Sequence, residues 1–80
     1  MIIVYALIND SGRIYVGMTT SIVRRLYEHN IGNVFSTKSY RPWRILYQEK
    51  LYTRQEARNR EKYLKSGVGK EYLKAIVKPM

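Results

Sequence analysis

The sequence predicts a single α+β domain over residues 1–80, with a three-stranded antiparallel β-sheet flanked by about three α-helices. The chain has 80 residues, which is enough for one domain with a compact core. Apolar residues make up 45% of it and aromatic residues 12%, which is too many for a disordered chain. Segments of strand and helix character follow one another in the order ββαβαα. This order is typical of helices packed on an antiparallel sheet.

The first two strands form a predicted hairpin. Residues 2–8 are rich in β-branched and aromatic side chains, and the turn sequence NDSG at 9–12 separates them from a second strand. The continuous apolar run of the first strand predicts a central position in the sheet. If a three-residue loop holds Gly12 in the left-handed conformation, residues whose numbers sum to 20 lie opposite one another, and Tyr5 faces Tyr15. A sum of 21 would place the two tyrosines on opposite faces.

A helix is predicted to follow the second strand. Either Thr20 or Ser21 can cap it, it runs to about Asn30, and Gly32 is the predicted stop. Its apolar stripe is predicted to contain Ile22, Val23, Leu26 and Tyr27. On periodicity alone, the remaining faces of this helix point to solvent.

The rest of the chain is predicted to contain a loop, a strand and two helices. Alternating side chains indicate the strand, and the sequence TRQE at 53–56 fits a capping box that opens the first of the two helices. The predicted segments are a loop over 32–41 that exposes Lys38 and Arg41, a strand over 43–51, a helix over 53–66 that stops at Gly67, and a helix over 70–77.

The charge of the chain favours a polyanionic partner. The chain has fifteen Lys and Arg residues and six Asp and Glu residues, which gives a net charge of +9 and a pI near 10. Charge alone leaves DNA, RNA and anionic lipid open. The absence of cysteine excludes disulfides, thiolate metal sites and a cysteine nucleophile. The opening MIIVYALI lacks a basic start and a cleavage site and is too short to span a membrane, so we expect a cytoplasmic protein without membrane contact.

Two residues stand out from the pattern of their helices. Glu61 follows Ala57 by four residues and precedes Leu64 by three, so it lies on or beside an inward face, where an ionised carboxylate needs a cation or an open pocket. An Arg or Lys partner would satisfy it equally well. His29, the only histidine, shares a helix face with Arg25, and an exposed histidine there needs no function. These residues alone support nucleic-acid binding more than any reaction.

Several stretches together resemble a known family. IVY at 3–5 precedes YVGMT at 15–19, RRLYEHN at 24–30, PWRILY at 42–47 and EARNRE at 56–61. Each is short, but their order and spacing cover nearly the whole chain and are similar to those of the GIY-YIG nucleases. The resemblance is to small stand-alone members that look like the N-terminal nuclease domain of the bacterial excinuclease.

The resemblance implies hydrolysis of a DNA phosphodiester with one divalent metal, Mg²⁺ or Mn²⁺. Tyr5 and Tyr15 match the family tyrosines, of which one is the general base or orients the attacking water; a phenol with a pKa of about 10 then needs neighbouring cations to lower it. Arg25 matches the arginine that stabilises the phosphate. His29 matches a residue that contacts the water or the phosphate, or shuttles a proton. Glu61 matches the metal ligand.

Other positions extend or depart from the family pattern. Gly17 matches a glycine that allows close approach of the backbone. Ile3 replaces the glycine of the first tripeptide, and Met18 stands where some relatives have lysine or a polar residue. Five further cations are expected to contact nucleic acid: Arg24, Lys38, Arg41, Arg58 and Lys65.

The function that these matches imply is an endonuclease, nicking or structure-selective, in DNA repair, recombination or turnover. Branched, flap or damaged DNA is the expected substrate class. Because larger relatives carry separate DNA-targeting domains, we expect specificity here to come from DNA shape or from a protein partner. Two alternatives remain open: a non-catalytic nucleic-acid-binding module that retains the nuclease fold, and a basic protein associated with RNA.

Overall fold

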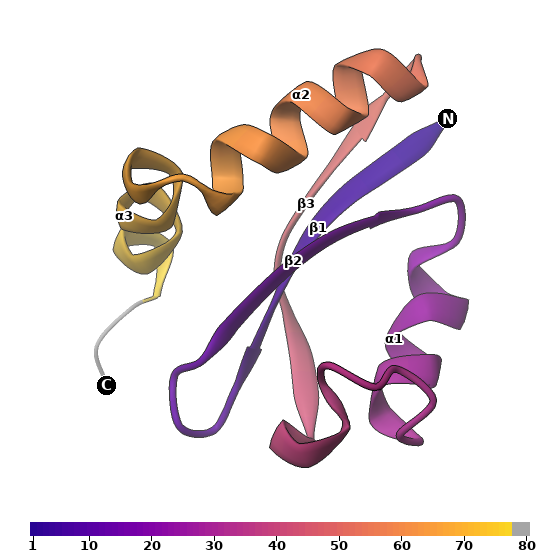
Figure 1. Ribbon diagram of the computed structural model, residues 1–80, viewed down its shortest axis with the longest axis vertical. Coiled ribbons are helices and arrows are strands. Elements are labelled where there is room, and N and C mark those ends of the chain that lie inside the picture. Colours follow the sequence, from indigo (N-terminus) through magenta and orange to yellow (C-terminus); the bar gives the residue numbers. More distant parts are fainter. Residues whose placement is uncertain (78–80) are drawn as a thin grey trace.

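The protein has the α+β architecture that the sequence predicts (Figure 1). The computed structural model describes residues 1–77. In chain order it contains β1 (Ile2–Asn9), β2 (Ile14–Thr19), α1 (Ile22–Asn30), the short 3₁₀ helix η1 (Lys38–Tyr40), β3 (Trp43–Leu51), α2 (Arg54–Lys65) and α3 (Gly67–Ile76). Ser21 caps α1, and Gly32, with a φ of 87°, follows its end as predicted. Over the described range, no helix is long and apolar enough to cross a membrane.

The sheet separates two hydrophobic cores. Its strand order is β2-β1-β3, with antiparallel neighbours, so β1 is the central strand as predicted. Figure 1 shows α1 on one side of the sheet and α2 and α3 on the other. The core under α2 and α3 buries Val4, Ala6, Val16, Ala57, Leu64 and Leu73, and the core under α1 buries Ile3, Tyr5, Leu7 and Trp43. Alternate residues of β1 thus enter different cores.

The hairpin register differs from the predicted one. Tyr5 pairs with Gly17, and Leu7 pairs with Tyr15, so the numbers of paired residues sum to 22 and not to 20. Because the two sums have the same parity, Tyr5 and Tyr15 still lie on one face of the sheet. They are diagonal neighbours, and their ring centroids are 6.4 Å apart.

The turn explains this register. Gly12 has the expected left-handed conformation, with a φ of 84°. However, Asn9 belongs to the strand and closes the loop instead of lying in it. Its backbone N–H donates to the carbonyl of Arg13 at 3.1 Å, and its side-chain oxygen accepts from the N–H of Arg13 at 2.8 Å. The pairing of Asn9 with Arg13 then fixes every pair along the hairpin.

The inward face of α1 is partly polar, which corrects the predicted stripe. Ile22 and Leu26 pack on the core as predicted, but Val23 is 80% exposed and Tyr27 is 63% exposed. His29, which periodicity alone places toward solvent, is fully buried. Residues three, four and seven positions after Ile22 lie on the same helix face, and His29 is the seventh. The polar residue at the end of this face is stable there because buried hydrogen-bond partners surround it.

The helix α2 begins as predicted, but α3 begins three residues early. The capping box at 53–56 forms both of its hydrogen bonds. Gly67, the predicted stop, is instead the first residue of α3, because Ser66 both ends α2 and caps α3. A Cβ at Gly69 would collide with the carbonyl oxygen of Tyr63. The glycine therefore lets α3 pack directly on the last turn of α2.

Candidate active site

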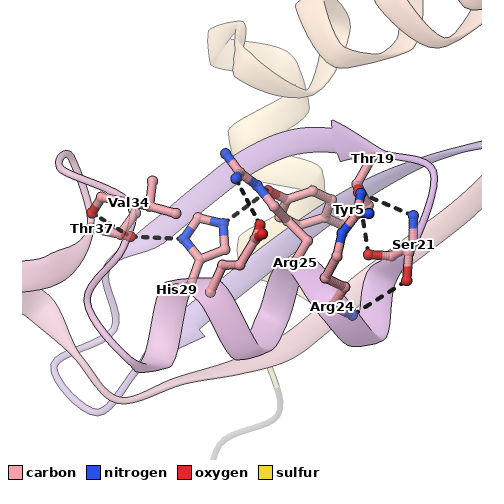
Figure 2. Close-up of polar contacts among 9 residues, drawn as sticks. Tyr5, Thr19, Ser21, Arg24, Arg25, His29, Val34 and Thr37 are labelled. Atoms are coloured by element: carbon pink, nitrogen blue, oxygen red, sulfur yellow. Dashed lines mark hydrogen bonds and ion pairs between the residues drawn. The ribbon is translucent and has the colours of Figure 1, made fainter.

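Polar side chains form a hydrogen-bonded chain beneath α1 (Figure 2). The hydroxyl oxygen of Tyr5 lies 2.9 Å from Nε2 of His29, and Nδ1 of His29 lies 2.7 Å from the hydroxyl of Thr37. That hydroxyl donates to the carbonyl of Val34 at 3.3 Å. At the other end, Nε of Arg25 donates to the oxygen of Tyr5 at 3.4 Å. Tyr5, His29 and Thr37 are almost completely buried.

One arrangement of protons satisfies every bond in this chain. A carbonyl only accepts, so Thr37 donates its proton to Val34 and accepts from His29. Nδ1 therefore carries the proton of the neutral imidazole, and Nε2 keeps a free lone pair. Tyr5 donates its phenol proton to Nε2 while its oxygen accepts from Arg25. An acceptor and a cationic donor thus meet at the same phenol oxygen.

Burial dominates the protonation of this chain. Desolvation raises the pKa of Tyr5 above its ordinary value of 10.0; the hydrogen bond from Arg25 opposes this rise, and the charges of Tyr15 and Glu61 add to it. The expectation that cations lower this pKa is therefore wrong for the protein alone. Burial, followed by the charge of Arg25, lowers the pKa of His29 to about 4. At neutral pH the pair is a neutral phenol and a neutral imidazole.

Arg25 connects the buried chain with the surface. Its Nε contacts Tyr5, and its Nη1 donates to a carboxylate oxygen of Glu28 at 3.1 Å. The side chain is 34% exposed. The hydrogen bond to Tyr5 raises the pKa of Arg25, which therefore stays protonated at any working pH. Arg25 can present a permanent positive charge to an anion that arrives from solvent.

Tyr15 and Gly17 border the same chain from β2. Tyr15 is half-buried, and its ring centroid lies 5.0 Å from that of His29 in an edge-to-face arrangement. Its hydroxyl takes no part in the bonds that join Tyr5 to Thr37. A Cβ at Gly17 would lie 2.7 Å from the hydroxyl oxygen of Tyr5. The close approach at Gly17 is thus made by the phenol of Tyr5, which fills the space of a side chain.

Glu61 lies on α2, on the opposite side of the sheet from α1. Its side chain is 18% exposed, and its carboxylate forms an ion pair with Lys65 at 3.3 Å. Its charge contributes to the raised pKa of Tyr5. The structure therefore brings Tyr5, Arg25 and His29 into contact, while Glu61 acts on Tyr5 through charge and is bonded to its own cation.

The donor set suits a divalent metal that is shared with a substrate. The carboxylate of Glu61 is a hard oxygen ligand of the kind that Mg²⁺ prefers. Within residues 1–77, no cluster of three or more His, Cys, Asp or Glu side chains gathers to hold a metal alone. Mg²⁺ needs only one or two carboxylates when phosphate oxygens and water complete its shell. Glu61 therefore fits as a single protein ligand, with Lys65 as the cation that a metal would replace.

Comparison with known proteins decides the family. The family model described as the GIY-YIG catalytic domain matches residues 1–73, a range that contains the hydrogen-bonded chain and Glu61. The chain belongs to the GIY-YIG family. Membership supports an endonuclease-type activity, and GIY-YIG nucleases generally use a divalent metal.

Two relatives resemble this GIY-YIG domain. The UPF0213 protein DP2720 of Desulfotalea psychrophila is 39% identical over 64 residues, which are 78% of this chain and 58% of the relative. The chain therefore spans less than two thirds of the length of that relative. The solution NMR structure of the UPF0213 protein BH0048 from Bacillus halodurans has 30% identity and a TM-score of 0.57, and the match covers 95% of this chain and 85% of that one. The domain is thus homologous to the UPF0213 proteins.

Three residues that support the GIY-YIG site are not among those predicted from the sequence. Thr37 is the partner that sets the tautomer of His29. Trp43 holds this threonine in place, since its indole N–H donates to the backbone carbonyl of Thr37 at 3.0 Å. Asn30 joins the end of α1 to Trp43 through two side-chain bonds of 2.7 and 3.0 Å. The stretches RRLYEHN and PWRILY contain Asn30 and Trp43, but the sequence gives no role for either side chain.

The five further cations of the GIY-YIG domain lie on separate elements. They are Arg24 on α1, Lys38 and Arg41 on the segment between α1 and β3, and Arg58 and Lys65 on α2. Lys38 and Arg41 are exposed as predicted. Arg24 lines a cavity together with Arg25. Their contact with nucleic acid stays a prediction.

Substitution of Gly17 by alanine is expected to destabilise the GIY-YIG domain by about 1–3 kcal/mol, because the new methyl group would overlap the buried phenol of Tyr5. Urea unfolding followed by circular dichroism would measure this loss. Gly67→Ala is the matched control, since a Cβ there meets nothing within 4 Å. Equal stability of the two variants would show that Tyr5 does not occupy this space.

The stability of the domain is expected to fall as the pH drops from about 6.5 toward 4. Between the ordinary pKa of 6.5 and the folded value of about 4, the unfolded chain binds a proton at His29 that the folded chain does not. The free energy of unfolding should therefore decrease by about 1.4 kcal/mol per pH unit in this window. Urea unfolding at several pH values tests this slope, which His29→Gln should flatten. Parallel slopes for both proteins would contradict a neutral, buried histidine.

Substitution of Thr37 by valine keeps the shape of the side chain but removes the acceptor for Nδ1 of His29. The imidazole should then lose its fixed tautomer, and the domain should lose about 1–3 kcal/mol of stability. Because the chain has a single histidine, ¹⁵N NMR of the imidazole reports this change without ambiguity. We expect protonated Nδ1 and unprotonated Nε2 in the unmodified protein and a mixture in the variant. An unaltered spectrum would rule out this role of Thr37.

Proposed function

We propose that this protein is a divalent-metal-dependent DNA endonuclease that hydrolyses phosphodiester bonds, as a nicking or structure-selective enzyme of DNA repair, recombination or turnover. One observation carries the proposal: the phenol of Tyr5 has an imidazole acceptor at 2.9 Å and a guanidinium donor at 3.4 Å on the same oxygen. A structural tyrosine needs one buried partner, whereas a phenol that takes part in proton transfer needs both an acceptor and charge stabilisation.

The proton path follows from the bonds already described. The oxygen of Tyr5 takes a proton from the attacking water while its own proton passes to Nε2 of His29. The phenol stays neutral throughout, so the raised pKa of Tyr5 does not prevent the reaction. The water oxygen forms a bond to phosphorus, the bond between phosphorus and the leaving sugar oxygen breaks, and the leaving oxygen takes a proton from solvent. Burial and the charge of Arg25 hold the pKa of His29 at about 4, so the imidazolium that results is a high-energy state, which the charge of Glu28 stabilises only in part.

Arg25 lies between this phenol and the surface and binds the phosphate in this proposal. Tyr5 is only 1% exposed, and the Arg25 side chain bridges its hydroxyl to the half-buried carboxylate of Glu28. A phosphate that binds Nη1 of Arg25 replaces Glu28 as its partner, while Nε of the same guanidinium stays at the hydroxyl of Tyr5. The same guanidinium then stabilises the negative charge that builds on the phosphate oxygens. Tyr15 packs edge-to-face on His29, and in this proposal its hydroxyl orients the water.

Glu61 holds the metal, Mg²⁺ or Mn²⁺, in this proposal. When bound, the metal supplies Lewis-acid stabilisation of phosphate charge and of the leaving oxygen. Glu61 would supply one carboxylate ligand, and the remaining positions would be left to phosphate oxygens and water. Lys65, now the partner of Glu61 at 3.3 Å, is left free to contact the DNA backbone.

The second candidate function is a nucleic-acid-binding module without turnover. The burial of Tyr5 and the ion pair of Glu61 with Lys65 favour it, because both groups are already satisfied within the protein. A binder, however, gains nothing from a histidine whose tautomer leaves a free lone pair toward a phenol. We therefore propose the endonuclease first.

Incubation of the purified protein with supercoiled plasmid and with flap, branched and single-stranded DNA tests the two functions. Each substrate is incubated with the protein in the presence of Mg²⁺, Mn²⁺ or EDTA. The endonuclease predicts cleavage that requires metal and that disappears in Arg25→Ala. Salt-sensitive binding of these substrates without cleavage of any of them would leave the binding module as the function.

A further inference from the structure

A cavity of about 280 Å³ lies next to the candidate active site and has no assigned role. It is formed by the start of β1, the end of β2, the first two turns of α1 and the start of α2. Its lining residues are Ile2, Met18, Thr19, Thr20, Arg24, Arg25, Glu28 and Arg54. Arg25 is shared with the candidate active site, because the same side chain donates to Tyr5. An occupant of the cavity would therefore lie directly beside the phosphate that Arg25 binds.

The charge of the cavity is strongly positive. Three guanidinium groups and one carboxylate line it. Arg25 and Glu28 form an ion pair at 3.1 Å and largely offset one another. Arg24 and Arg54 are exposed, and within residues 1–77 neither forms an ion pair with an acidic side chain. Two arginines from different helices thus line one cavity, and their charges are available to an anionic ligand.

The donors of the cavity match a phosphate group. Guanidinium groups bind phosphate oxygens through paired N–H donors, and two of them can hold one group from two sides. Thr20 adds an exposed hydroxyl at the rim, whereas the hydroxyl of Thr19 is already bonded to the backbone of Ser21. Ile2 and Met18 are partly buried apolar residues of the lining, so fewer water molecules compete with an anion there.

We propose that this cavity binds the DNA backbone phosphate next to the one that is cleaved, with Arg24 and Arg54 as its two cations. The inference rests on the proposed function, because it takes the phosphate at Arg25 as the reacting one. Arg54 is not among the DNA-binding residues that the sequence predicts; α2 brings it to α1 only in the folded domain. A contact of this kind holds the strand in register and does not touch the reacting atoms.

Arg54→Gln tests the proposal, with Arg44→Gln as the matched control. Arg44 lies on β3 opposite Ile8, near one end of β1. The cavity contains Ile2 from the other end of β1, so Arg44 is remote from it. Affinity for a labelled duplex oligonucleotide is measured by fluorescence anisotropy in EDTA over a series of salt concentrations. Arg54→Gln should weaken binding about three- to tenfold at low salt and reduce the salt slope by about 1. Arg44→Gln should leave both quantities close to those of the unmodified protein.

The kinetic readout separates this residue from the catalytic ones. In metal-dependent cleavage, Arg54→Gln should raise KM and leave kcat unchanged, because the contact is equal in the ground and transition states. Equal affinity and equal salt slopes for the two variants in EDTA would overturn the phosphate site. Absence of cleavage by the unmodified protein would instead refute the proposed function, and the binding comparison in EDTA would still decide the cavity.

Discussion

Replacement of Tyr5 by phenylalanine is expected to lower the rate of metal-dependent DNA cleavage by about 10² to 10⁴, the usual range for loss of a general base. The ring stays in place, and only the oxygen between His29 and Arg25 is removed. Nε2 of His29 then has no proton donor, so the domain should also lose about 1–3 kcal/mol of stability. Initial rates of plasmid nicking, measured below the unfolding temperature of both proteins, give the comparison.

Tyr52→Phe is the matched control for this change, because Tyr52 is 82% exposed. It should cleave and unfold like the unmodified protein. A Tyr5→Phe protein that is folded and still cleaves at the unmodified rate would show that Tyr5 is structural. Tyr15→Phe would then be the next variant to compare, since Tyr15 is the other tyrosine beside His29.

Replacement of Glu61 by glutamine is expected to lower metal-dependent cleavage by at least about a hundredfold, because a neutral amide is a poor ligand for Mg²⁺ and metal stabilisation contributes several kcal/mol. The stability of the fold should change little. Lys65, the partner of Glu61, has a side chain that is 54% exposed, and ion pairs with an exposed partner contribute at most about 1 kcal/mol. Isothermal titration with Mn²⁺ in the presence of a DNA duplex gives a second readout that does not depend on turnover.

Glu71→Gln provides the control for charge, because Glu71 is an exposed acid of α3 that pairs with Lys74 at 3.7 Å. It should bind Mn²⁺ and cleave DNA like the unmodified protein. If Glu61→Gln retains full Mn²⁺ affinity, another group holds the metal and the assignment of Glu61 is wrong.

Most of the fold can be predicted because each element carries a local signal. The capping box at 53–56 fixes the start of α2, and Gly12 fixes the turn of the hairpin. The errors come from residues with two possible roles. Composition assigns Asn9 to the turn, but it closes the loop as part of β1 and shifts the register by two. Gly67 is a plausible stop by residue type, but the serine before it starts another helix.

The candidate site can be predicted less well, because periodicity assumes that inward faces are apolar. The inward face of α1 carries Arg25 and His29, so the rule assigns Val23 and Tyr27 to the core instead. Family resemblance singles out Tyr5, Arg25 and His29, which hydrogen bonds join in the structure. It does not show that Thr37 sets the histidine tautomer, since this contact depends on the path of the segment after α1.

The central claim is that the phenol between His29 and Arg25 belongs to a DNA-cleaving site. The most direct measurement is the nicking of supercoiled plasmid by the unmodified protein and by Tyr5→Phe, side by side, in Mg²⁺ and in EDTA. Nicking by the unmodified protein in Mg²⁺ alone, reduced at least about a hundredfold in the variant, is the predicted result. Equal nicking by both proteins in Mg²⁺, or nicking that persists in EDTA, would contradict it.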